Sequence, residues 1–345
     1  MRFPKLAALI VLAAPLTAKA FDRGQVQPFA TLPAGSAGPE GLEVDRQGNA
    51  YVTTFGFTAA GPTTQPSHLI VFDNGGKLVR DVVISGASPH VLGLSFHPST
   101  GALLVVDFGA GVVLNVNPKT GASTVFMTLP ALPNPPAGSG LNDITFDKAG
   151  NVYVSDSAQG VIWKTGAHGG VATIWTSDPL LTTTGVPPFG ANGIRFNRHE
   201  TAFFATNTGN DTVIKIPVSG GVAGKAAVFV NSINGADGLI LDDEDNLWVV
   251  ANQNDEIVVV DPSAKVIAKL GDFEGVEHGS PVGLLFPASL RFSGQDLLVT
   301  NLSLDQRIFN PTFISVDSEW TAQVSRYTVV KLRARIPRLT GLDNH

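Results

Sequence analysis

Oxygen-bearing side chains recur at one position of an internal repeat in this sequence. This position comes directly before a recurring Gly, which Asp or Ser replaces in two of the units. Its six residues are Glu40, Leu92, Asn142, Asn192, Asp237 and Ala288. Four of these six residues are carboxylates or carboxamides, although the neighbouring segments are apolar. A hard cation prefers oxygen ligands, and Ca²⁺ takes about six to eight of them. The four side chains could hold one divalent cation with waters, or they could bond to one another or to ordered water.

His90 and a second repeated position are further candidates. His90 lies two residues before Leu92, so it could be a general base near the same site or a rim histidine without catalytic duty. His97, His168 and His199 lie in turn-like segments and are expected to be solvated. Asp143 either orients a ligand or is a turn residue. The second position is expected to cap neighbouring turns, and it comprises Thr54, Asp107, Asp156, Asn207 and Asn301.

The elements that must position these residues are read from the repeat itself. Its unit opens with an alternating apolar segment, turns at Gly, Asn or Asp, and enters a β-branched or aromatic run, as in Pro39–Val44 followed by Ala50–Thr54. Two such strands form a hairpin. The positions equivalent to Gly41 are Gly93, Asp143, Gly193, Gly238 and Ser289. A unit length of about 50 residues is typical of propeller blades.

Third and fourth strands follow in most units. Val112–Val116 and Val161–Lys164 are expected third strands, and Ser123–Leu129 is an expected fourth strand. Four antiparallel strands repeated in six units predict an all-β, six-bladed β-propeller. An open ring would expose strand edges, so we expect Gln25–Leu32 and Tyr327–Arg333 to complete one blade, with residues 303–324 as an insertion within it.

The first 20 residues have the pattern of a secretory signal peptide. Arg2 and Lys5 precede an apolar run over residues 7–16, and Ala18-Lys19-Ala20 has the small residues of a cleavage site. A buried N-terminal helix is the alternative. Residues 21–345 are then expected to form one propeller domain, rather than two three-bladed lobes, and the protein is expected to be exported to the periplasm or secreted.

Composition excludes several functional classes. With no Cys, the chain has no disulfide scaffold, Cys-bound zinc, iron–sulfur cluster or thiol nucleophile. The formal net charge is −6 and no basic tract is present, so a nucleic-acid partner is not expected. No other stretch is apolar for long enough to span a membrane. A monomer is expected. Two loops over the channel mouth, Phe126–Ala137 and Leu180–Phe189, could offer a hydrophobic rim to a substrate, or could simply pack as loops.

The repeats resemble one known superfamily over nearly all of residues 25–333. The motifs that carry the resemblance are Pro39-Glu40-Gly41, Leu141-Asn142-Asp143, Ala191-Asn192-Gly193 and Ala236-Asp237-Gly238. They are similar to those of the gluconolactonase and senescence-marker-protein (regucalcin) propellers, a superfamily that includes paraoxonases and strictosidine-synthase-like proteins. The resemblance implies a channel calcium ion held by Glu40, Asn142, Asn192 and Asp237.

The resemblance also implies hydrolysis of a lactone or related ester, with the metal polarising the carbonyl. Asp237 is the candidate that would activate water or attack, although a carboxylate bound to a dication is a poor base. Paraoxonases use a His near the place of His90, but the register differs by two residues. A non-catalytic propeller that binds a protein or small molecule through its loops is the alternative, because the fold hosts both functions.

Overall fold

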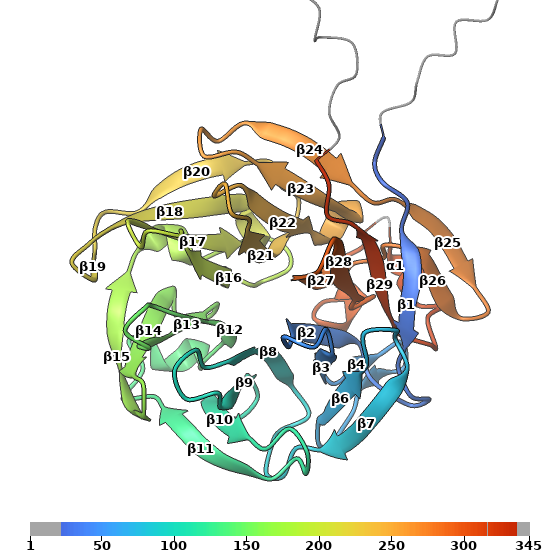
Figure 1. The fold of residues 1–345 in the computed structure, drawn as a ribbon, viewed down its shortest axis with the longest axis horizontal. Coiled ribbons are helices and arrows are strands. Elements are labelled where there is room, and N and C mark those ends of the chain that lie inside the picture. Colours follow the sequence, from blue (N-terminus) through green and yellow to red (C-terminus); the bar gives the residue numbers. More distant parts are fainter. Residues whose placement is uncertain (1–21, 316, 337–345) are drawn as a thin grey trace, which may run out of the picture.

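Six strands form the inner wall of a ring. The computed structural model describes residues 22–315 and 317–336, and the expected signal peptide lies outside this range. Each inner strand contacts the next, and β27 contacts β2, so that the ring is closed around a central axis (Figure 1). The inner strands are β2 (Pro39–Val44), β8 (Val91–Phe96), β12 (Leu141–Phe146), β16 (Ala191–Phe196), β21 (Ala236–Leu241) and β27 (Pro287–Ser293).

A second strand pairs antiparallel with each inner strand. These strands are rich in Val, Leu and aromatic residues, which favour a pleated, buried surface. They are β3 (Ala50–Thr54), β9 (Leu103–Asp107), β13 (Val152–Asp156), β17 (Ala202–Asn207), β22 (Leu247–Ala251) and β28 (Asp296–Asn301).

Third strands continue each antiparallel run outward, and a fourth strand borders each of them. The third strands are β6 (His68–Phe72), β10 (Val112–Val116), β14 (Val161–Gly166), β18 (Thr212–Ser219), β23 (Glu256–Val260) and β29 (Thr328–Arg333). The bordering strands are β7 (Leu78–Val83), β11 (Ser123–Thr128), β15 (Gly169–Ser177), β20 (Ala227–Asn231), β24 (Val266–Leu270) and β1 (Gln27–Thr31).

The two ends of the described chain meet in one sheet, as the sequence predicted. β1 pairs antiparallel with β29, and Gln27 lies opposite Lys331. The predicted strands Gln25–Leu32 and Tyr327–Arg333 are therefore present with slightly shorter bounds. The insertion between β28 and β29 carries the 3₁₀ turn η5 (Gln306–Ile308) and the one-turn helix α1 (Ser318–Thr321).

The sheets are less uniform than the repeats suggest. β15 is long, and its first residues pair in parallel with β11, which joins two antiparallel runs into an eight-stranded sheet. The short strand β19 (Val222–Ala223) and the hairpins β4–β5 (Phe57–Thr58, Gly61–Pro62) and β25–β26 (Phe273–Glu277, Ser280–Gly283) are additional. The prediction is thus confirmed at the level of an all-β, propeller-like fold with very little helix.

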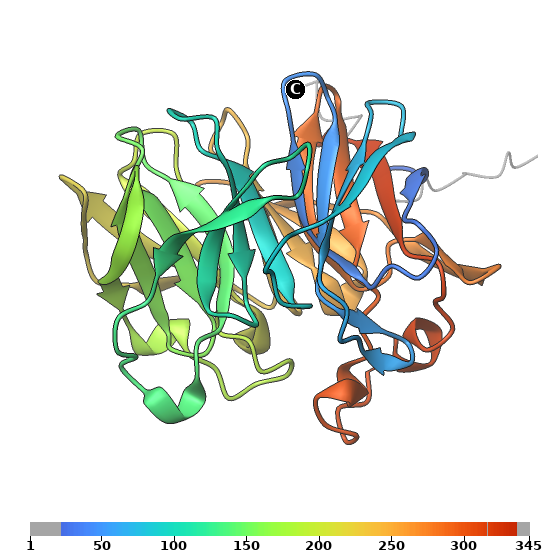
Figure 2. The same cartoon turned by 90° about the horizontal axis from the view of Figure 1, so that it is seen from below.

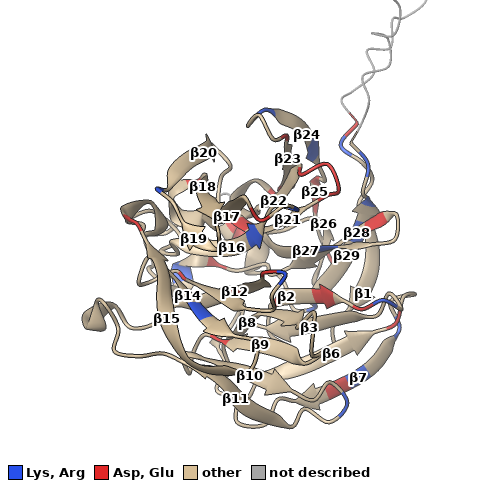
Figure 3. Cartoon of the chain, turned by 60° about the vertical axis from the view of Figure 1, so that its left-hand side comes forward, with Lys and Arg blue, Asp and Glu red and all other residues tan. Residues whose placement is uncertain are grey.

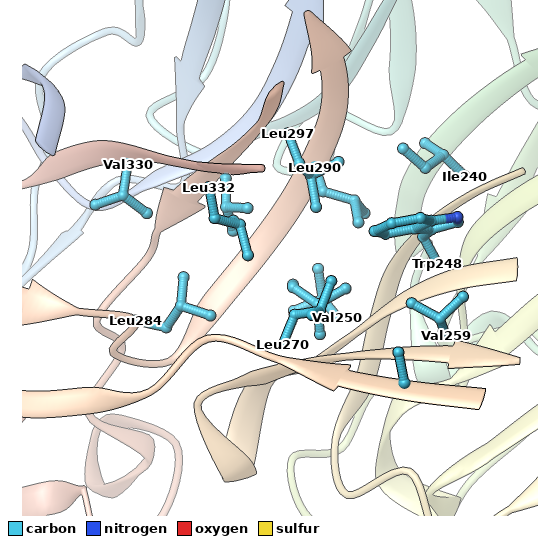
Figure 4. Close-up of a cluster of buried hydrophobic side chains, with 13 residues drawn as sticks. Ile240, Trp248, Val250, Val259, Leu270, Leu284, Leu290, Leu297, Val330 and Leu332 are labelled. Atoms are coloured by element: carbon cyan, nitrogen blue, oxygen red, sulfur yellow. The ribbon is translucent and has the colours of Figure 1, made fainter. Parts of the chain in front are cut away.

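The core is divided into clusters that lie between neighbouring sheets. In one of them Trp248 and Val250 of β22 pack with Leu290 and Leu297 of the adjoining sheet (Figure 4). Burying each such side chain stabilises the fold by about 1.5–3 kcal/mol. The strands are therefore fixed by packing on both faces, which leaves the loops free to build a site.

Many of the loops with short helical turns lie on one side of the ring (Figure 2). Besides η5 they include η1 (Pro135–Ala137), η2 (Pro179–Leu181), η3 (Thr208–Asn210) and η4 (Asn252–Asn254). Within residues 22–315 and 317–336, no helix reaches the length and apolarity needed to cross a membrane.

Candidate metal-binding site

A β-bulge at the same place in every inner strand aims the repeated side chains. In β2 the pairing partner changes from Thr54 opposite Pro39 to Val52 opposite Leu42, which leaves one extra residue at Glu40 and Gly41. The other five inner strands shift at the equivalent place. A bulge re-aims the side chain that it carries, so the six positions turn toward the axis together.

Glycine after the bulge makes room for the neighbouring strand. A Cβ on Gly193 would lie 2.6 Å from the carbonyl oxygen of Asp237, and one on Gly238 would lie 2.5 Å from that of Ala288. The backbone of the neighbouring strand therefore approaches closely at these glycines.

Hydroxyl groups on the second strands hold the backbone of the next inner strand. Thr206 Oγ1 donates to the Asp237 carbonyl oxygen at 2.6 Å, and Ser155 Oγ donates to that of Asn192 at 2.6 Å. Thr300 Oγ1 donates to Glu40 O across the closure at 3.1 Å. These bonds fix the backbone at the positions from which the candidate side chains project.

All four predicted ligands line one small pocket. Glu40, Asn142, Asn192 and Asp237 are each about 95% buried and lie together in a cavity of about 20 Å³. That volume suits one water molecule or one ion. The structure therefore brings together the residues that the sequence grouped by register.

The carboxylates of this pocket lack a positive partner. Glu40 Oε2 and Asp237 Oδ1 are buried and accept no hydrogen bond from the described residues. Burial, with the charges of Asp237 and Asp143 added, raises the pKa of Glu40 well above its usual value. Burial raises the pKa of Asp237 to about 7. Unpaired buried carboxylates are costly, so the pocket fits a cation better than it fits empty space.

Two further polar residues in the pocket were not predicted. Asn252, in η4, donates through Nδ2 to Asp237 Oδ2 at 3.0 Å, and its own Oδ1 is buried without a partner. Thr208, in η3, accepts from Asn192 Nδ2 at 2.9 Å. Each of these residues begins a 3₁₀ turn that follows the second strand of its unit. The only sequence signal for either residue is that it stands directly after the second repeated position of that unit.

The donor set depends on its amides. Among residues 22–315 and 317–336, no group of three or more His, Cys, Asp or Glu side chains is placed to hold a metal ion. The pocket offers two carboxylates, and the amides of Asn142, Asn192 and Asn252 complete its oxygen supply. Hard cations accept such neutral oxygens together with carboxylates.

His90 lies above this pocket without lining it. Its Nδ1 is 2.6 Å from the carbonyl oxygen of Phe55, which can only accept, so Nδ1 carries the proton and Nε2 is the basic nitrogen of the neutral ring. The ring stacks on Phe57 at 4.9 Å between centroids. His90 therefore does not line the pocket with the four predicted ligands, but Nε2 of its neutral ring could act as a base.

Three residues further along the same inner strands, the channel has a different character. Glu43, Ser95, Arg195 and Arg291 line a separate cavity there. Arg195 Nη1 lies 2.6 Å from Asp143 Oδ2, and Arg291 Nε lies 3.6 Å from Glu43 Oε2. Both signs of charge appear on inner strands near the middle of the ring (Figure 3). Asp143 is thus neither a turn residue nor a partner of a predicted ligand side chain, because it is paired with Arg195.

The second repeated position is structural, as predicted. Asp156 accepts from the backbone N–H groups of Gly140, Ala158 and Gln159 and from the indole N–H of Trp163. Asn301 likewise accepts from the N–H of a neighbouring loop residue, Leu285.

The prediction for His97 is wrong. His97 is 1% exposed, Nε2 lies 2.9 Å from Gly150 O, and Nδ1 accepts from Ser99 N and Thr100 N. Its ring is held between two turns, whereas His168 and His199 are exposed as expected.

Of the two predicted mouth loops, one reaches the pocket. Pro187 and Phe189 of the Leu180–Phe189 segment line it, together with Phe55, Leu92, Phe286, Leu302 and Leu304. No residue of Phe126–Ala137 does so. The pocket therefore combines a polar part, which we call the oxygen-rich floor (the four predicted ligands with Thr208 and Asn252), with an apolar remainder.

Comparisons with known proteins identify the family of the chain. Residues 85–271 match the sequence model of the SMP-30/Gluconolactonase/LRE-like region. No curated protein sequence matches the chain.

Three solved structures share the fold at low sequence identity. A luciferin-regenerating enzyme is 15% identical, with a TM-score of 0.60 over 87% of this chain and 92% of that chain. The calcium-binding protein regucalcin from Agrobacterium tumefaciens is 18% identical, with a TM-score of 0.56 over 92% and 96%. A gluconolactonase from Xanthomonas campestris is 13% identical, with a TM-score of 0.58 over 88% of each chain.

Proposed function

The chain belongs to the SMP-30/gluconolactonase/LRE-like family, and from this premise we propose that it is a hydrolase of lactones or related esters that depends on calcium or another divalent cation. This agrees with the superfamily resemblance of its repeats. The observation that carries the proposal is the pair of buried carboxylates, Glu40 and Asp237, which share one ion-sized pocket without any cation of the protein.

Glu40, Asn142, Asn192 and Asp237 would hold the cation, and Asn252 would support it through Asp237. A divalent cation supplies, when bound, polarisation of a carbonyl oxygen and stabilisation of the oxyanion that develops there. Thr208 orients the Asn192 amide through the hydrogen bond at 2.9 Å. The role of the chain at this floor is therefore to preorganise oxygen ligands before the substrate binds.

Two residues could move the proton of the attacking water. Asp237 Oδ1 is free of hydrogen bonds and faces the pocket, but a bound dication would make this carboxylate a weak base. In the neutral ring of His90, Nε2 is the nitrogen that can accept a proton, because Nδ1 donates to Phe55 O. We assign the base to one of these two atoms, and the variants Asp237→Asn and His90→Gln would separate them by which one keeps metal binding while losing turnover.

The proposal extends to the architecture and location. We infer six blades of four strands, because the eight-stranded sheet is joined between β11 and β15 by two residue pairs only. Residues 21–345 would form this one domain as a monomer. The pattern of residues 1–20 supports cleavage of a signal peptide and export to the periplasm or medium.

A non-catalytic binding propeller is the second candidate, and the size of the cavity favours it. A volume of about 20 Å³ holds an ion but no lactone. Hydrolysis therefore requires that the aromatic residues above the pocket move apart, whereas a partner bound at the loops requires no opening.

Metal analysis combined with a lactone assay tests the proposal. Elemental analysis of the purified protein should give near one calcium per chain, and EDTA should abolish turnover of a small lactone panel. At a calcium concentration of 100 Kd the ion should add about 2.7 kcal/mol of stability, or about 4 °C for a chain of this size. Calcium without turnover would favour the binding propeller, and the absence of both would overturn the metal site.

A further inference from the structure

An aromatic cluster covers the oxygen-rich pocket. We call it the aromatic wall, and it comprises Phe55, Phe57, His90, Phe108, Phe189 and Phe309. Its phenyl rings meet edge-to-face, with 4.8 Å between the centroids of Phe55 and Phe57 and 5.6 Å between those of Phe55 and Phe108. Such contacts are the preferred arrangement of aromatic pairs.

The wall is assembled from loops that are far apart in the sequence. Phe57 belongs to the β4–β5 hairpin, Phe108 follows β9, Phe189 lies in the loop before β16, and Phe309 directly follows η5. Phe57, Phe108, Phe189 and Phe309 are each only partly buried. They are therefore accessible from the solvent side while they pack on the lining of the pocket.

Apart from the oxygen-rich floor, the lining of the pocket offers no side chain that can form a hydrogen bond. Apart from this floor, the pocket is bounded by the carbon side chains of Phe55, Leu92, Pro187, Phe189, Phe286, Leu302 and Leu304. The polar lining side chains are the four predicted ligands with Thr208 and Asn252. A polyhydroxylated ligand would lose its hydration here without finding partners for its hydroxyl groups.

We infer that the site takes an apolar, ring-bearing lactone or ester, such as one with an aryl substituent, and discriminates against sugar lactones. This inference rests on the proposed function. The ligand's carbonyl would face the oxygen-rich floor, and its apolar substituent would lie against the aromatic wall. No side chain of the wall offers a sugar a hydrogen bond, His90 excepted.

Phe309 is the side chain whose place the substituent would take. Its ring contacts Phe57 at 5.8 Å and Phe189 at 5.5 Å between centroids, and so bridges two loops over the pocket. A ligand ring in the same position would replace both edge-to-face contacts. When the pocket opens, the contacts of Phe309 are then replaced by those of the ligand's aromatic ring. A sugar ring has no aromatic edge or face and cannot make the same contacts.

Binding of two non-hydrolysable analogues tests the inference independently of turnover. A phenyl-substituted δ-lactam and glucono-δ-lactam would be titrated by calorimetry into the full protein with saturating calcium. We expect at least tenfold tighter binding of the phenyl lactam. Phe189→Ser should reduce this preference to below threefold, while Phe229→Ser, a matched change in β20 outside the wall, should leave it intact.

Equal affinities, tighter binding of the sugar lactam, or no binding of either would overturn the inference. Thermal stabilisation by calcium is measured on the same samples. If it persists while the preference is absent, the substrate class is wrong and the metal site stands; if both are absent, the proposed function fails too. Phe57→Ser serves as a second wall variant in case Phe189→Ser does not fold, and it should lose the preference in the same way.

Discussion

Two levels of one channel treat buried carboxylates in opposite ways. At the level of Glu40 and Asp237 no cationic side chain of the described residues pairs with either carboxylate, and an oxygen of each has no partner among these residues. Three residues along the same strands, Arg195 lies 2.6 Å from Asp143 and Arg291 lies 3.6 Å from Glu43. The six strands and their spacing are the same at both levels, so the difference lies in the side chains alone.

The comparison shows what the first level lacks. A buried charge is tolerated when it is paired, and the part of the chain that the structure describes supplies guanidinium groups at one level and none at the other. The amides of Asn142 and Asn192 provide further oxygens where a guanidinium would otherwise stand. A cation from solution is the component that would make the two levels electrostatically equivalent.

The largest expected effect follows from removing one unpaired carboxylate. Asp237→Asn should lower calcium affinity and reduce hydrolysis by about 10²–10³-fold, the usual loss when one electrostatic stabiliser is removed. In EDTA the same variant should melt at a higher temperature than the wild type at pH 8, because an uncompensated buried charge is gone. Calorimetric titration of calcium and thermal melts with and without EDTA measure both effects.

A carboxylate of the same type at a partly exposed site outside the pocket controls for the loss of charge. Asp296→Asn, which affects a surface pair with Arg333, should change neither calcium affinity nor turnover. If Asp237→Asn destabilised the metal-free protein and left the stabilisation by calcium unchanged, the unpaired and paired levels of the channel would not differ as described.

Breaking the paired level should instead cost stability with or without calcium. Arg195→Met leaves Asp143 buried and unpaired, which costs about 3–5 kcal/mol or about 4–7 °C. The double variant Asp143→Asn/Arg195→Met should recover most of this loss, because no charge is then left unpaired. Thermal melts of both variants with and without calcium measure it, and a double variant as unstable as the single one would contradict the pairing.

The sequence predicted the unpaired level better than the paired one. The four ligand candidates share a register within a repeat, and register survives folding because strand pairing is regular. Arg195 and Asp143 come from different units and one sits off that register, so their contact depends on how neighbouring strands are placed. The prediction for His97 failed for a similar reason, because one of its partners, Gly150, belongs to a turn of the next unit.

Local irregularity limited the fold prediction too. Asn252 and Thr208 stand in 3₁₀ turns, where the repeat imposes no side-chain direction. The parallel contact of β15 with β11 arises because β15 runs to nine residues. Apolar alternation predicts that strands exist, but it does not limit how far an edge strand extends.

A third carboxylate pair sharpens the comparison, because it has neither a guanidinium nor a place in the channel. Burial, followed by the charge of Asp317, raises the pKa of Asp255 to about 8. Burial raises the pKa of Asp317 to about 6. The folded protein thus holds a proton that the unfolded chain releases near pH 4, and the contribution of the pair to stability falls as pH rises from about 4 to about 8.

Asp255→Asn should flatten that fall. The amide keeps an oxygen to accept from Phe286 N, as Asp255 Oδ1 does at 2.7 Å, but it carries no titrating proton. We expect the difference in unfolding free energy between pH 5 and pH 8 to shrink by on the order of 1–2 kcal/mol. Denaturant unfolding in saturating calcium holds the channel constant, and parallel pH curves for variant and wild type would refute the assignment.

The smallest expected effect concerns how the unpaired level is aimed. Thr206→Val removes the hydroxyl that donates to Asp237 O at 2.6 Å while keeping the side-chain volume, so it should cost about 1 kcal/mol. The equivalent residues Val106 and Val250 show that this position tolerates Val.

If the hydroxyl of Thr206 only ties two strands together, the stabilisation by calcium should be unchanged. If it also fixes the bulge that directs the Asp237 carboxylate, calcium affinity should fall a few-fold, and we expect this second result. Val106→Thr, facing a strand whose ligand is the neutral Asn142, should change stability by a similar amount but calcium affinity by less, because directing an amide matters less to a cation than directing a carboxylate.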